Sequence, residues 1–321
     1  MEETDIEFSI ISGSSEEMLF GCIDSLVETM RGVPFSWTVV ITCNTPETSL
    51  AATLRVRYPG VRIIQNLEQR GFAANHNTVL TNSRARYVWL LNDDLLILPG
   101  AVEKVMQFLE KPENARVAAV SPKLLNPDGS LQPSTYSFPS MPQLLLAHSG
   151  LRHLSPVESV VKRLAPLIRK SPGSSRYWAH DRTIEVDTLR GACVAMRMKA
   201  VREVGPMVEV ALVGGEETEW HRRFKEHGWK VVYYPEAAVV HYGSQTVREG
   251  SNNHYPEYLK GALFFFRTDR GRATYSLFCA SLMVVFGIRT AVAWMTRNKS
   301  DVGVAKRYAT VAWDGLRGRV T

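Results

Sequence analysis

The sequence lacks the features that mark several common classes of protein. Its 321 residues include four cysteines, Cys22, Cys43, Cys193 and Cys279, whose wide spacing fits neither a metal site nor a disulfide framework. Residues 2–7 hold four acids and no Lys or Arg, so the basic region and apolar run of a secretory signal peptide are missing there. We therefore expect a chain in a reducing compartment, with its main domain in the cytoplasm.

A strong excess of charge is also missing from most of the chain. The formal net charge is +6, but residues 256–321 hold eleven Lys or Arg against four Asp or Glu, a local +7. The first 255 residues are therefore close to neutral, so no nucleic acid is expected as a partner and the basic character belongs to the tail. With 45% hydrophobic residues, the chain can bury a large core and still carry an appendage.

Short apolar runs rich in β-branched residues alternate with helical patterns over the first 120 residues. This alternation is typical of an α/β fold with a mostly parallel sheet flanked by helices. We expect strands at 8–11, 38–42, 61–65, 87–91 and 117–120, and helices at 16–30, 48–58, 73–83 and 100–110.

The middle of the chain is less regular. Residues 126–182 are rich in Pro, Ser and Gly, which predicts a partly irregular excursion that could carry an acceptor-binding lid. Beyond it, the patterns predict a strand at 185–196, a short helix that ends at Val204, a helix at about 216–227 and a strand at 230–234.

A helical appendage is expected from about Tyr258 onward. Residues 273–288 carry no charge, and seven uncharged residues follow Arg289. A run of this length is short for a membrane span, and a longer span would bury Arg289 at a cost of about 2.5–3.5 kcal/mol. We therefore expect an interfacial or re-entrant anchor flanked by basic residues. A true span and a core helix packed on the main domain are the alternatives.

The triplet Asn92-Asp93-Asp94 directly follows the apolar run 87–91. In an extended chain residues 92 and 94 point the same way, so a strand that ends here presents an amide oxygen and a carboxylate to one small volume. Ligands of open α/β sheets bind beyond the carboxyl ends of the strands, and oxygen ligands suit Mg²⁺ or Mn²⁺ bridging to a diphosphate. The alternative is a turn in which an aspartate caps a helix.

A second acidic segment, residues 214–220 (GGEETEW), enters a predicted helix. Carboxylates in a first helical turn feel the positive end of the helix dipole and tend to stay ionised, so Glu217 is the candidate general base. Trp220 and Phe224, four residues apart, would form the buried stripe that holds this helix. The alternative is simple charge decoration of a helix start.

Two weaker signals complete the set. His241 ends the apolar run 237–240, and a neutral imidazole can complete a metal coordination shell, although a lone histidine near a strand end is more often structural. In residues 66–75 (NLEQRGFAAN), Gly71 opens a predicted helix with Arg70 beside it. Backbone N–H groups at such a helix start suit an anionic nucleotide.

Taken together and in this order, these segments resemble the family 2 inverting glycosyltransferases of GT-A fold, in particular the bacterial rhamnosyltransferase-like branch. The resemblance covers roughly residues 6–250. The strand-end Asn-x-Asp of the family is similar to 92–94, its asparagine-glycine-phenylalanine segment to 66–75, and its Glu-Asp-x-Asp signature to 216–219. Its G-x-L-Q-x-S element is similar to 129–134, and its small-residue segment to 190–193.

The resemblance implies a role for each matching residue. Asp94 and His241 would hold a divalent metal ion, Mg²⁺ or Mn²⁺, and Glu217 would be the catalytic base. The nucleotide-sugar donor would be bound by Ser12, Asn44, Asn66, Arg70, Gly71, Asn75, Asn92 and Asp93. The acceptor side would be formed or supported by Gly191, Ala192, Glu216, Glu219 and Trp220.

The sequence departs from the family pattern in two places. Cys43-Asn44 stands where the family commonly has Asp-Asn, whose aspartate reads the nucleobase, so the resemblance does not say how this chain recognises the base. Glu217 and Glu219 replace aspartates, which lengthens each side chain by a methylene group and shifts the place of the acceptor hydroxyl. Neither change removes the chemistry.

The resemblance implies transfer of a sugar, with dTDP-L-rhamnose the favoured donor and UDP-sugars next, to a saccharide or polyprenyl-diphosphate-linked saccharide in cell-envelope polysaccharide synthesis. We expect a catalytic domain at 1–255, attached peripherally to the inner face of the cell membrane through the basic, apolar tail 256–321. The sequence is compatible with a homo-oligomer and does not fix the oligomeric state.

Two other functions fit parts of the pattern. One is a non-catalytic nucleotide-sugar-binding or scaffold protein. The other is a nucleotidyltransferase, although the Gly-rich phosphate loop with a basic residue expected of that class is absent from residues 9–15.

Overall fold

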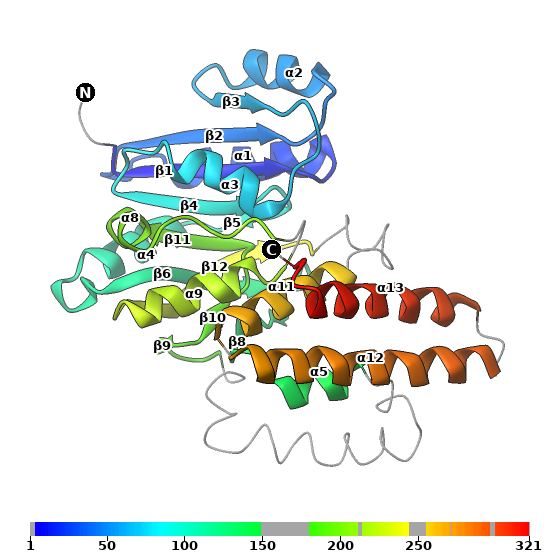
Figure 1. Cartoon of the computed structure of the whole chain (residues 1–321). Helices are drawn as coiled ribbons and strands as arrows, with labels where there is room; N and C mark the ends of the chain where they lie inside the picture. The colour runs from blue at the N-terminus through cyan, green and yellow to red at the C-terminus, as the bar shows by residue number, and fades with distance from the viewer. Residues whose placement is uncertain are drawn as a thin grey trace.

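A ten-stranded mixed sheet lies at the centre of the protein in a computed structural model (Figure 1). The structure describes residues 4–148, 180–210, 214–243, 255–269, 271–295 and 299–320. The main path of the sheet has the order β3-β2-β1-β4-β11-β6-β12-β5, with β7 beside β6 and β9 beside β12. The strands are β1 (Ile6–Ser12), β2 (Trp37–Cys43), β3 (Arg62–Gln65), β4 (Tyr87–Asn92), β5 (Leu95–Ile97), β6 (Val117–Leu125), β7 (Leu131–Gln132), β9 (Ile184–Glu185), β11 (Cys193–Arg197) and β12 (Lys230–His241).

The first half of this sheet is parallel, as the sequence predicts. β1 pairs in parallel with β2 and β4, and β2 with β3. Each crossover carries a helix, because parallel neighbours need a connection long enough to return the chain to the same end of the sheet. These helices are α1 (Glu16–Thr29), which Ser15 caps by accepting a hydrogen bond from the Met18 N–H at 3.3 Å, α2 (Ser49–Arg57) and α3 (Phe72–Leu80).

The second half of the sheet differs from the predicted pattern. The strand expected at 185–196 is three short strands, β9, β10 (Thr188–Leu189) and β11, which pair with β12, with β8 (Thr135–Tyr136) and with β4 and β6 respectively. A single strand is therefore wrong here, because these residues change partners twice. β11 runs antiparallel between β4 and β6, whereas the longest pairing in this half, β6 with β12, is parallel.

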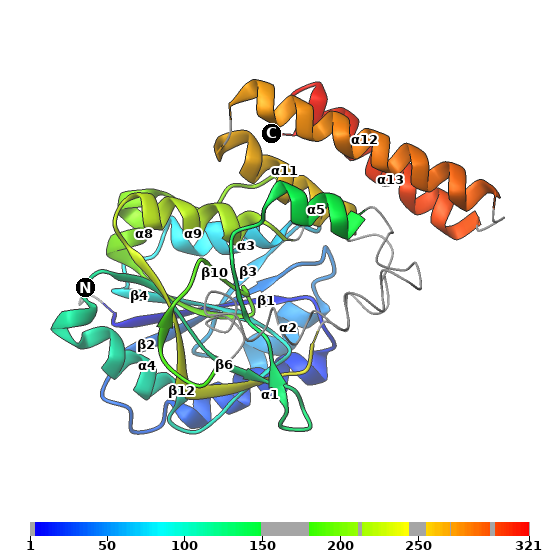
Figure 2. The ribbon, with the colours of Figure 1, turned by 90° about the horizontal axis from the view of Figure 1, so that it is seen from below.

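Helices cover both faces of the sheet, as Figure 2 shows. One face is covered by α1, α2 and α4 (Ala101–Glu110), whose buried side chains pack with Phe8, Trp89 and their neighbours. The other is covered by α3, α8 (Met198–Val204) and α9 (Glu216–Glu226), where Trp220 and Phe224 are buried with their ring centroids 4.9 Å apart. The predicted stripe on α9 is confirmed, and it fixes the helix that carries the acidic segment.

A separate helical layer follows the sheet in sequence. It consists of α11 (Tyr255–Asp269), α12 (Arg272–Met295) and α13 (Lys299–Leu316), which share a third hydrophobic cluster and lie beside the sheet domain in both views. The described part of the predicted excursion contributes α5 (Met141–His148), which contacts α12. The remaining part of the predicted lid, 149–179, lies outside the described residues.

The long helix α12 has two apolar faces. Phe278, Leu282 and Phe286 are buried against the rest of the helical layer, whereas Leu277, Val284, Ile288 and Met295 are each at least 60% exposed. At 100° per residue the buried and exposed sets lie on opposite sides of the helix. Among the described helices, α12 is the one whose length and composition would suffice to cross a membrane.

Candidate active site

Asp94 and His241 meet at the end of the sheet. β12 pairs antiparallel with β5, so His241 lies opposite Leu95, the residue that follows Asp94. The imidazole Nε2 lies 3.2 Å from the Asp94 Oδ1, and both residues are buried. The Tyr242 N–H also donates to the Asp94 carbonyl oxygen at 3.0 Å, which fixes the chain just past His241. The sheet thus brings together two residues that are far apart in the sequence.

The donor set at this point suits a hard divalent cation. The pair supplies one carboxylate oxygen and one imidazole nitrogen, and neighbouring ligands of an octahedral ion with bonds of about 2.0–2.1 Å are roughly 3 Å apart. The observed Nε2 to Oδ1 distance of 3.2 Å is close to that spacing. No group of three or more His, Cys, Asp or Glu side chains that could hold a metal occurs among the described residues. Waters or the diphosphate of a donor could fill the remaining positions around a cation here.

Glu217 lies in the first turn of α9, which is preceded by two glycines in the left-handed region, Gly214 at φ +89° and Gly215 at φ +99°. Its carboxylate packs against Gly191, since a Cβ added to that glycine would lie 2.7 Å from Glu217 Oε1 and 3.0 Å from Phe72 Cζ. Burial raises the pKa of Glu217, and backbone hydrogen bonds with Gly215 and Gly191 oppose that rise. Gly191 is therefore required by this close approach.

One continuous set of contacts joins Glu217 to His241. Arg190, next to Gly191, donates from Nη1 to Gln132 Oε1 at 3.2 Å. The same Oε1 lies 2.6 Å from the His241 Nδ1. On the other side of Gly191, the buried Ala192 accepts through its carbonyl oxygen from the Asn92 N–H at 2.9 Å. The sheet and the loop before β11 therefore bring the base and metal-ligand candidates into one region.

The donor-side candidates form a network of amides where β1, β2 and β3 end. The Asn44 N–H donates to Ser12 Oγ at 3.1 Å, and Asn44 Oδ1 accepts from Asn66 Nδ2 at 3.0 Å and from the Arg70 N–H at 2.8 Å. Asn66 Nδ2 also donates to Asn75 Oδ1 at 2.7 Å. These contacts fix the three strand ends relative to one another.

The same network reaches the start of α3. Gly71 is the N-cap residue of this helix, and its carbonyl oxygen accepts from the Asn75 N–H at 3.1 Å. Asn44 Nδ2 and Asn75 Nδ2 both donate to the Arg70 carbonyl oxygen, at 3.0 and 3.1 Å. The Arg70 side chain donates to Thr78 Oγ1 at 3.3 Å. The helix N-terminus, which favours anions, is thereby held at this edge of the sheet.

Asp93 and Asn92, the other donor-side candidates, have different surroundings. Asp93 Oδ2 accepts from the backbone N–H groups of Gly13 and Ser14, both at 2.7 Å, so this buried carboxylate holds the loop after β1. Burial raises the pKa of Asp93, against the effect of those bonds. Asn92 Nδ2 lies 3.4 Å from the His241 Nε2. Direct donor binding by either residue stays a prediction.

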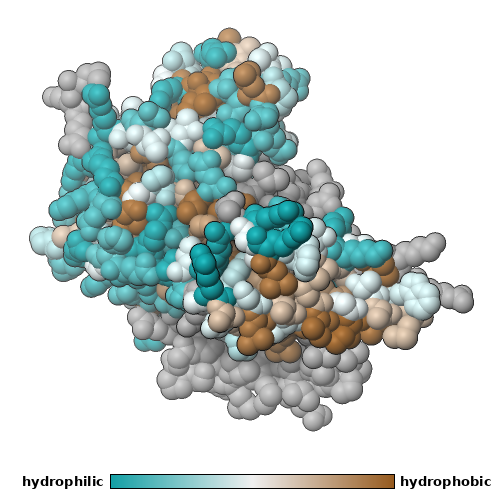
Figure 3. Space-filling model, in the orientation of Figure 1, coloured by the Kyte–Doolittle hydropathy of each residue, from teal (hydrophilic) through white to brown (hydrophobic). Residues whose placement is uncertain are grey.

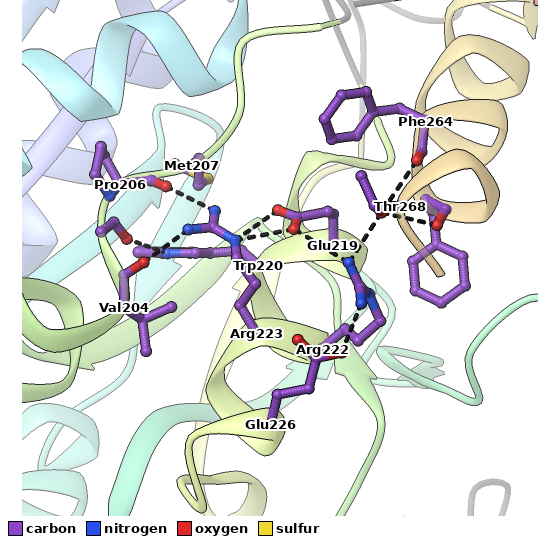
Figure 4. A network of polar contacts seen from close by, with 12 residues as sticks. Val204, Pro206, Met207, Glu219, Trp220, Arg222, Arg223, Glu226, Phe264 and Thr268 are labelled. Carbon is purple, nitrogen blue, oxygen red and sulfur yellow. Dashed lines mark hydrogen bonds and ion pairs between the residues drawn. The ribbon is translucent and has the colours of Figure 1, made fainter. Parts of the chain in front are cut away.

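Glu219 and Trp220 hold α9, the helix that carries Glu217, in place (Figure 4). Glu219 Oε2 lies 2.8 Å from Arg223 Nε, and Trp220 Nε1 donates to the Gly205 carbonyl oxygen at 2.8 Å. Residues 217 and 219 are about 200° apart around a helix, so Glu219 faces away from the Glu217 side. Glu216 is buried at the start of the same helix. These contacts support α9, and a direct role at the acceptor stays a prediction.

Tyr258 lies beside the candidate site, a placement that the sequence does not predict. A Cβ on Gly214 would lie 2.2 Å from the Tyr258 ring, so α11 packs against the loop that leads to Glu217. The negative charge of Glu217 contributes to the raised pKa of Tyr258, behind burial, so the two side chains are electrostatic neighbours. Tyr258 is 45% exposed. Its place depends on the packing of a distant helix, and only its aromatic character was visible in the sequence.

Comparisons with known proteins agree with this geometry. The family model "Glycosyltransferase like family 2" matches residues 10–258. A relative from two strains of Mycobacterium tuberculosis, N-acetylglucosaminyl-diphospho-decaprenol L-rhamnosyltransferase, is 24% identical over 230 residues, which is 67% of this chain and 69% of the relative.

Two solved structures show the fold. A mannosyltransferase from Pyrobaculum calidifontis in complex with GDP-Man and Mn²⁺ matches with a TM-score of 0.57 and 11% identity, over 99% of this chain and 88% of its own. GalNAc-T7 with UDP, GalNAc and Mn²⁺ matches with a TM-score of 0.51 and 13% identity, over 74% and 44%. The family match extends from the second half of β1 to the first residues of α11 and so includes every candidate residue above. The chain therefore belongs to glycosyltransferase family 2, and it is a glycosyltransferase with the GT-A type of α/β fold.

Proposed function

We propose that the protein is a metal-dependent inverting glycosyltransferase that moves a sugar, with rhamnose favoured, from a nucleotide-diphosphate donor to a saccharide or lipid-linked saccharide. The observation that carries the proposal is the meeting of Asp94 and His241, at 3.2 Å, in one contact network with Glu217. The relative is named an L-rhamnosyltransferase of a diphospho-decaprenol-linked sugar, which supports a rhamnosyl donor and a polyprenyl-diphosphate-linked acceptor. That the donor is dTDP-L-rhamnose and that the product belongs to cell-envelope polysaccharide synthesis are further parts of the proposal.

Glu217 is the proposed general base. It would take the proton of an acceptor hydroxyl as that oxygen forms its bond to the anomeric carbon and the bond from this carbon to the diphosphate oxygen breaks. Attack from the face opposite the leaving nucleotide inverts the configuration in one displacement. The raised pKa of Glu217 supports this role, because it makes the carboxylate a stronger proton acceptor than an exposed glutamate.

Asp94 and His241 are the proposed protein ligands of Mg²⁺ or Mn²⁺. A bound divalent cation supplies charge neutralisation to the leaving diphosphate. The amide network around Asn44 would hold the donor nucleotide next to it, and the start of α3 presents N–H groups to an anion. Because Cys43 is a buried residue at the end of β2, nucleobase recognition would have to use other groups, such as the Asn44 side chain.

We propose that the acceptor arrives from a membrane surface at the inner face of the cell membrane. In Figure 3 hydrophobic residues gather over the α12 and α13 part of the molecule. Leu277, Val284, Ile288 and Met295 form the exposed stripe of α12. This stripe belongs to residues 256–321, which carry a net positive charge. An apolar face flanked by basic residues suits an interfacial helix on anionic lipid. Tyr258, on the helix that precedes α12, would then lie between the lipid and Glu217.

A transfer assay tests the proposed reaction. The full chain is incubated with dTDP-L-rhamnose or a UDP-sugar and a polyprenyl-diphosphate-linked N-acetylglucosamine, with and without Mn²⁺. We expect nucleoside diphosphate release and a product of inverted anomeric configuration, both dependent on acceptor and metal. Donor binding without turnover across the donor panel would favour a non-catalytic binding protein, and pyrophosphate release from a nucleoside triphosphate would favour a nucleotidyltransferase.

Flotation with anionic phospholipid vesicles tests the membrane surface. We expect the double variant V284E/I288E to lower partitioning by about tenfold or more, because two apolar side chains leave the lipid and two charges oppose it. The matched control is V56E/L67E, which adds the same charges at apolar residues that are 85% and 88% exposed outside the helical layer. Equal partitioning of both double variants and the unchanged protein would exclude the stripe as the membrane contact.

A further inference from the structure

Gln132 in β7 contacts His241 with both ends of its side-chain amide. Its Nε2 donates to the His241 carbonyl oxygen at 3.3 Å and to Asn126 Oδ1 at 3.0 Å. Its Oε1 lies 2.6 Å from the His241 Nδ1 and accepts from Arg190 Nη1 at 3.2 Å. All of these contacts depend on the antiparallel pairing of β7 with β6, which brings Gln132 opposite Leu124.

These four contacts fix the direction of the amide. Nε2 faces two oxygen atoms, a carbonyl and an amide oxygen, and each of them only accepts hydrogen bonds. Oε1 faces the guanidinium of Arg190, which only donates. Rotating the amide by 180° would therefore place acceptor against acceptor on one side and donor against donor on the other. The oxygen of Gln132 must be the atom that faces the imidazole.

An amide oxygen cannot donate, so the short Oε1 contact requires the hydrogen on the His241 Nδ1. In a neutral imidazole the other nitrogen, Nε2, then carries the lone pair. Asn92 Nδ2, 3.4 Å from Nε2, agrees with an accepting Nε2. The same Nε2 lies 3.2 Å from the Asp94 carboxylate, which only accepts when it is ionised, so a bare lone pair on Nε2 is favourable there when a cation lies between the two groups. We propose that Gln132 is a positioning residue that sets the Nδ1–H tautomer of His241 and thereby aims the Nε2 lone pair into the divalent-cation site.

The inference rests on the metal site of the proposed function. Partners that hold the second nitrogen of a metal-binding histidine fix its tautomer and ring orientation, and their loss typically weakens metal binding 10–100-fold. Gln132 also holds Arg190, whose neighbour Gly191 contacts Glu217. The same amide therefore contacts both His241, the proposed metal ligand, and Arg190, the neighbour of the glycine that contacts Glu217.

Two measurements on the full chain test the role of Gln132. In spectra of protein with ¹⁵N-labelled histidine, Mg²⁺ and UDP, we expect His241 with its proton on Nδ1, and loss of that preference in Gln132→Ala. In titrations with Mn²⁺ and UDP followed by electron paramagnetic resonance, we expect Gln132→Leu and Gln132→Ala to bind Mn²⁺ about 10–100-fold more weakly. Gln132→Glu should weaken binding less than Gln132→Ala, because a carboxylate still accepts from Nδ1–H and Arg190 although it loses the two hydrogen bonds that Nε2 donates.

The outcomes separate this inference from the proposed function. Gln107→Leu, on the exposed side of α4, is the matched control and should bind Mn²⁺ normally. Failure of the unchanged protein to bind Mn²⁺ with UDP would overturn the metal site and this inference together. Normal binding by folded Gln132→Ala, or an Nε2–H tautomer in the unchanged protein, would overturn this inference alone. If Gln132→Leu does not fold, Gln132→Ala and Gln132→Glu still decide the matter.

Discussion

The two edges of the active site are built in different ways. The donor edge is a network of neutral amides, Asn44, Asn66 and Asn75, that bond to one another and to the backbone within a single stretch of the chain. The acceptor edge joins charged and aromatic side chains from distant segments, Glu217 on α9 and Tyr258 on α11, through glycines with no room for a side chain. The donor edge is thus fixed by hydrogen bonds among strand ends within residues 12–75, whereas the acceptor edge joins segments much farther apart in the sequence.

The largest effect should follow from removal of the base on the acceptor edge. We expect Glu217→Gln to lower kcat by about 10²–10⁴-fold, the usual contribution of general base catalysis, with the donor still bound normally. A carboxylate with a raised pKa must lose its proton to work, so activity should fall with falling pH at a higher pH than for an ordinary glutamate, whose value is 4.5. Steady-state kinetics against pH and donor titration measure both.

The control for this substitution lies on the same helix. Glu226 is paired with Arg222 at 2.6 Å near the end of α9, and Glu226→Gln makes the same chemical change away from the site. It should keep nearly full activity. Full turnover by Glu217→Gln would exclude that residue as the base. The acceptor edge would then contribute by positioning the acceptor and not by taking its proton.

The next largest effect should come from the glycine contact of the acceptor edge. A Cβ on Gly261 of α11 would lie 2.3 Å from the Gly214 carbonyl oxygen and 2.7 Å from Gly215 Cα, so Gly261→Ala must displace backbone. Overpacking of this kind costs about 1–3 kcal/mol, and we expect a lower melting temperature and a higher KM for the acceptor. The donor edge is not touched, so donor affinity should be unchanged.

Gly287→Ala on α12 is the matched control, because nothing lies within 4 Å of a Cβ there. In a helix interior this change should stabilise by about 0.5–1 kcal/mol. Thermal unfolding of the two variants gives opposite shifts if the contact is as close as the structure has it. Equal melting temperatures would contradict the tight packing of α11 on the acceptor edge.

A third comparison of the two halves of the sheet uses acid unfolding. Each half of the sheet is covered by a helix with a buried histidine. His76 in α3 lies 2.8 Å from Ser9 Oγ, and His221 in α9 lies 2.9 Å from Thr188 Oγ1. Burial lowers the pKa of each to about 3. Their value in the unfolded chain is about 6.5, so the unfolded chain binds more protons between these limits. Stability should therefore be highest above pH 6.5 and fall as the pH drops toward 3.

Each of these histidines contributes at most about 1.4 kcal/mol per pH unit to this loss. Urea unfolding at several pH values measures it, and His76→Gln and His221→Gln should each flatten the pH dependence of the unfolding free energy. The exposed His227→Gln is the control. If a variant leaves the curve unchanged, burial does not lower the pKa of that histidine.

The difference between the edges explains what the sequence could predict. The predicted strands and helices of residues 1–120 are confirmed, since their periodicity is local, and so is the α/β fold they imply. Residues 66–75 could be identified from Gly71 at a predicted helix start together with the family resemblance. The contact of Asp94 with His241 could be inferred from strand ends, but only because the family resemblance related two distant segments.

Other features could not be read from the sequence. Gln132 meets His241 through a two-residue strand, and such a strand has no periodicity to detect. β11 enters the sheet antiparallel, which depends on where the chain returns and not on its own residues. The sequence offers an anchor, a membrane span or a core helix for the tail, whereas α12 has one apolar face that is buried and one that is exposed. Long-range packing decides all three.

The backbone contact between Gly261 and the Gly214–Gly215 turn couples the tail to the start of α9. Neither side carries a side chain that could bend to absorb a shift, so a movement of α11 is passed directly to the turn from which Glu217 projects. If α12 rests on lipid, the position of the bilayer relative to the sheet would affect the position of the Glu217 carboxylate. An enzyme of this design would be most active when seated on its membrane and less so when free in solution.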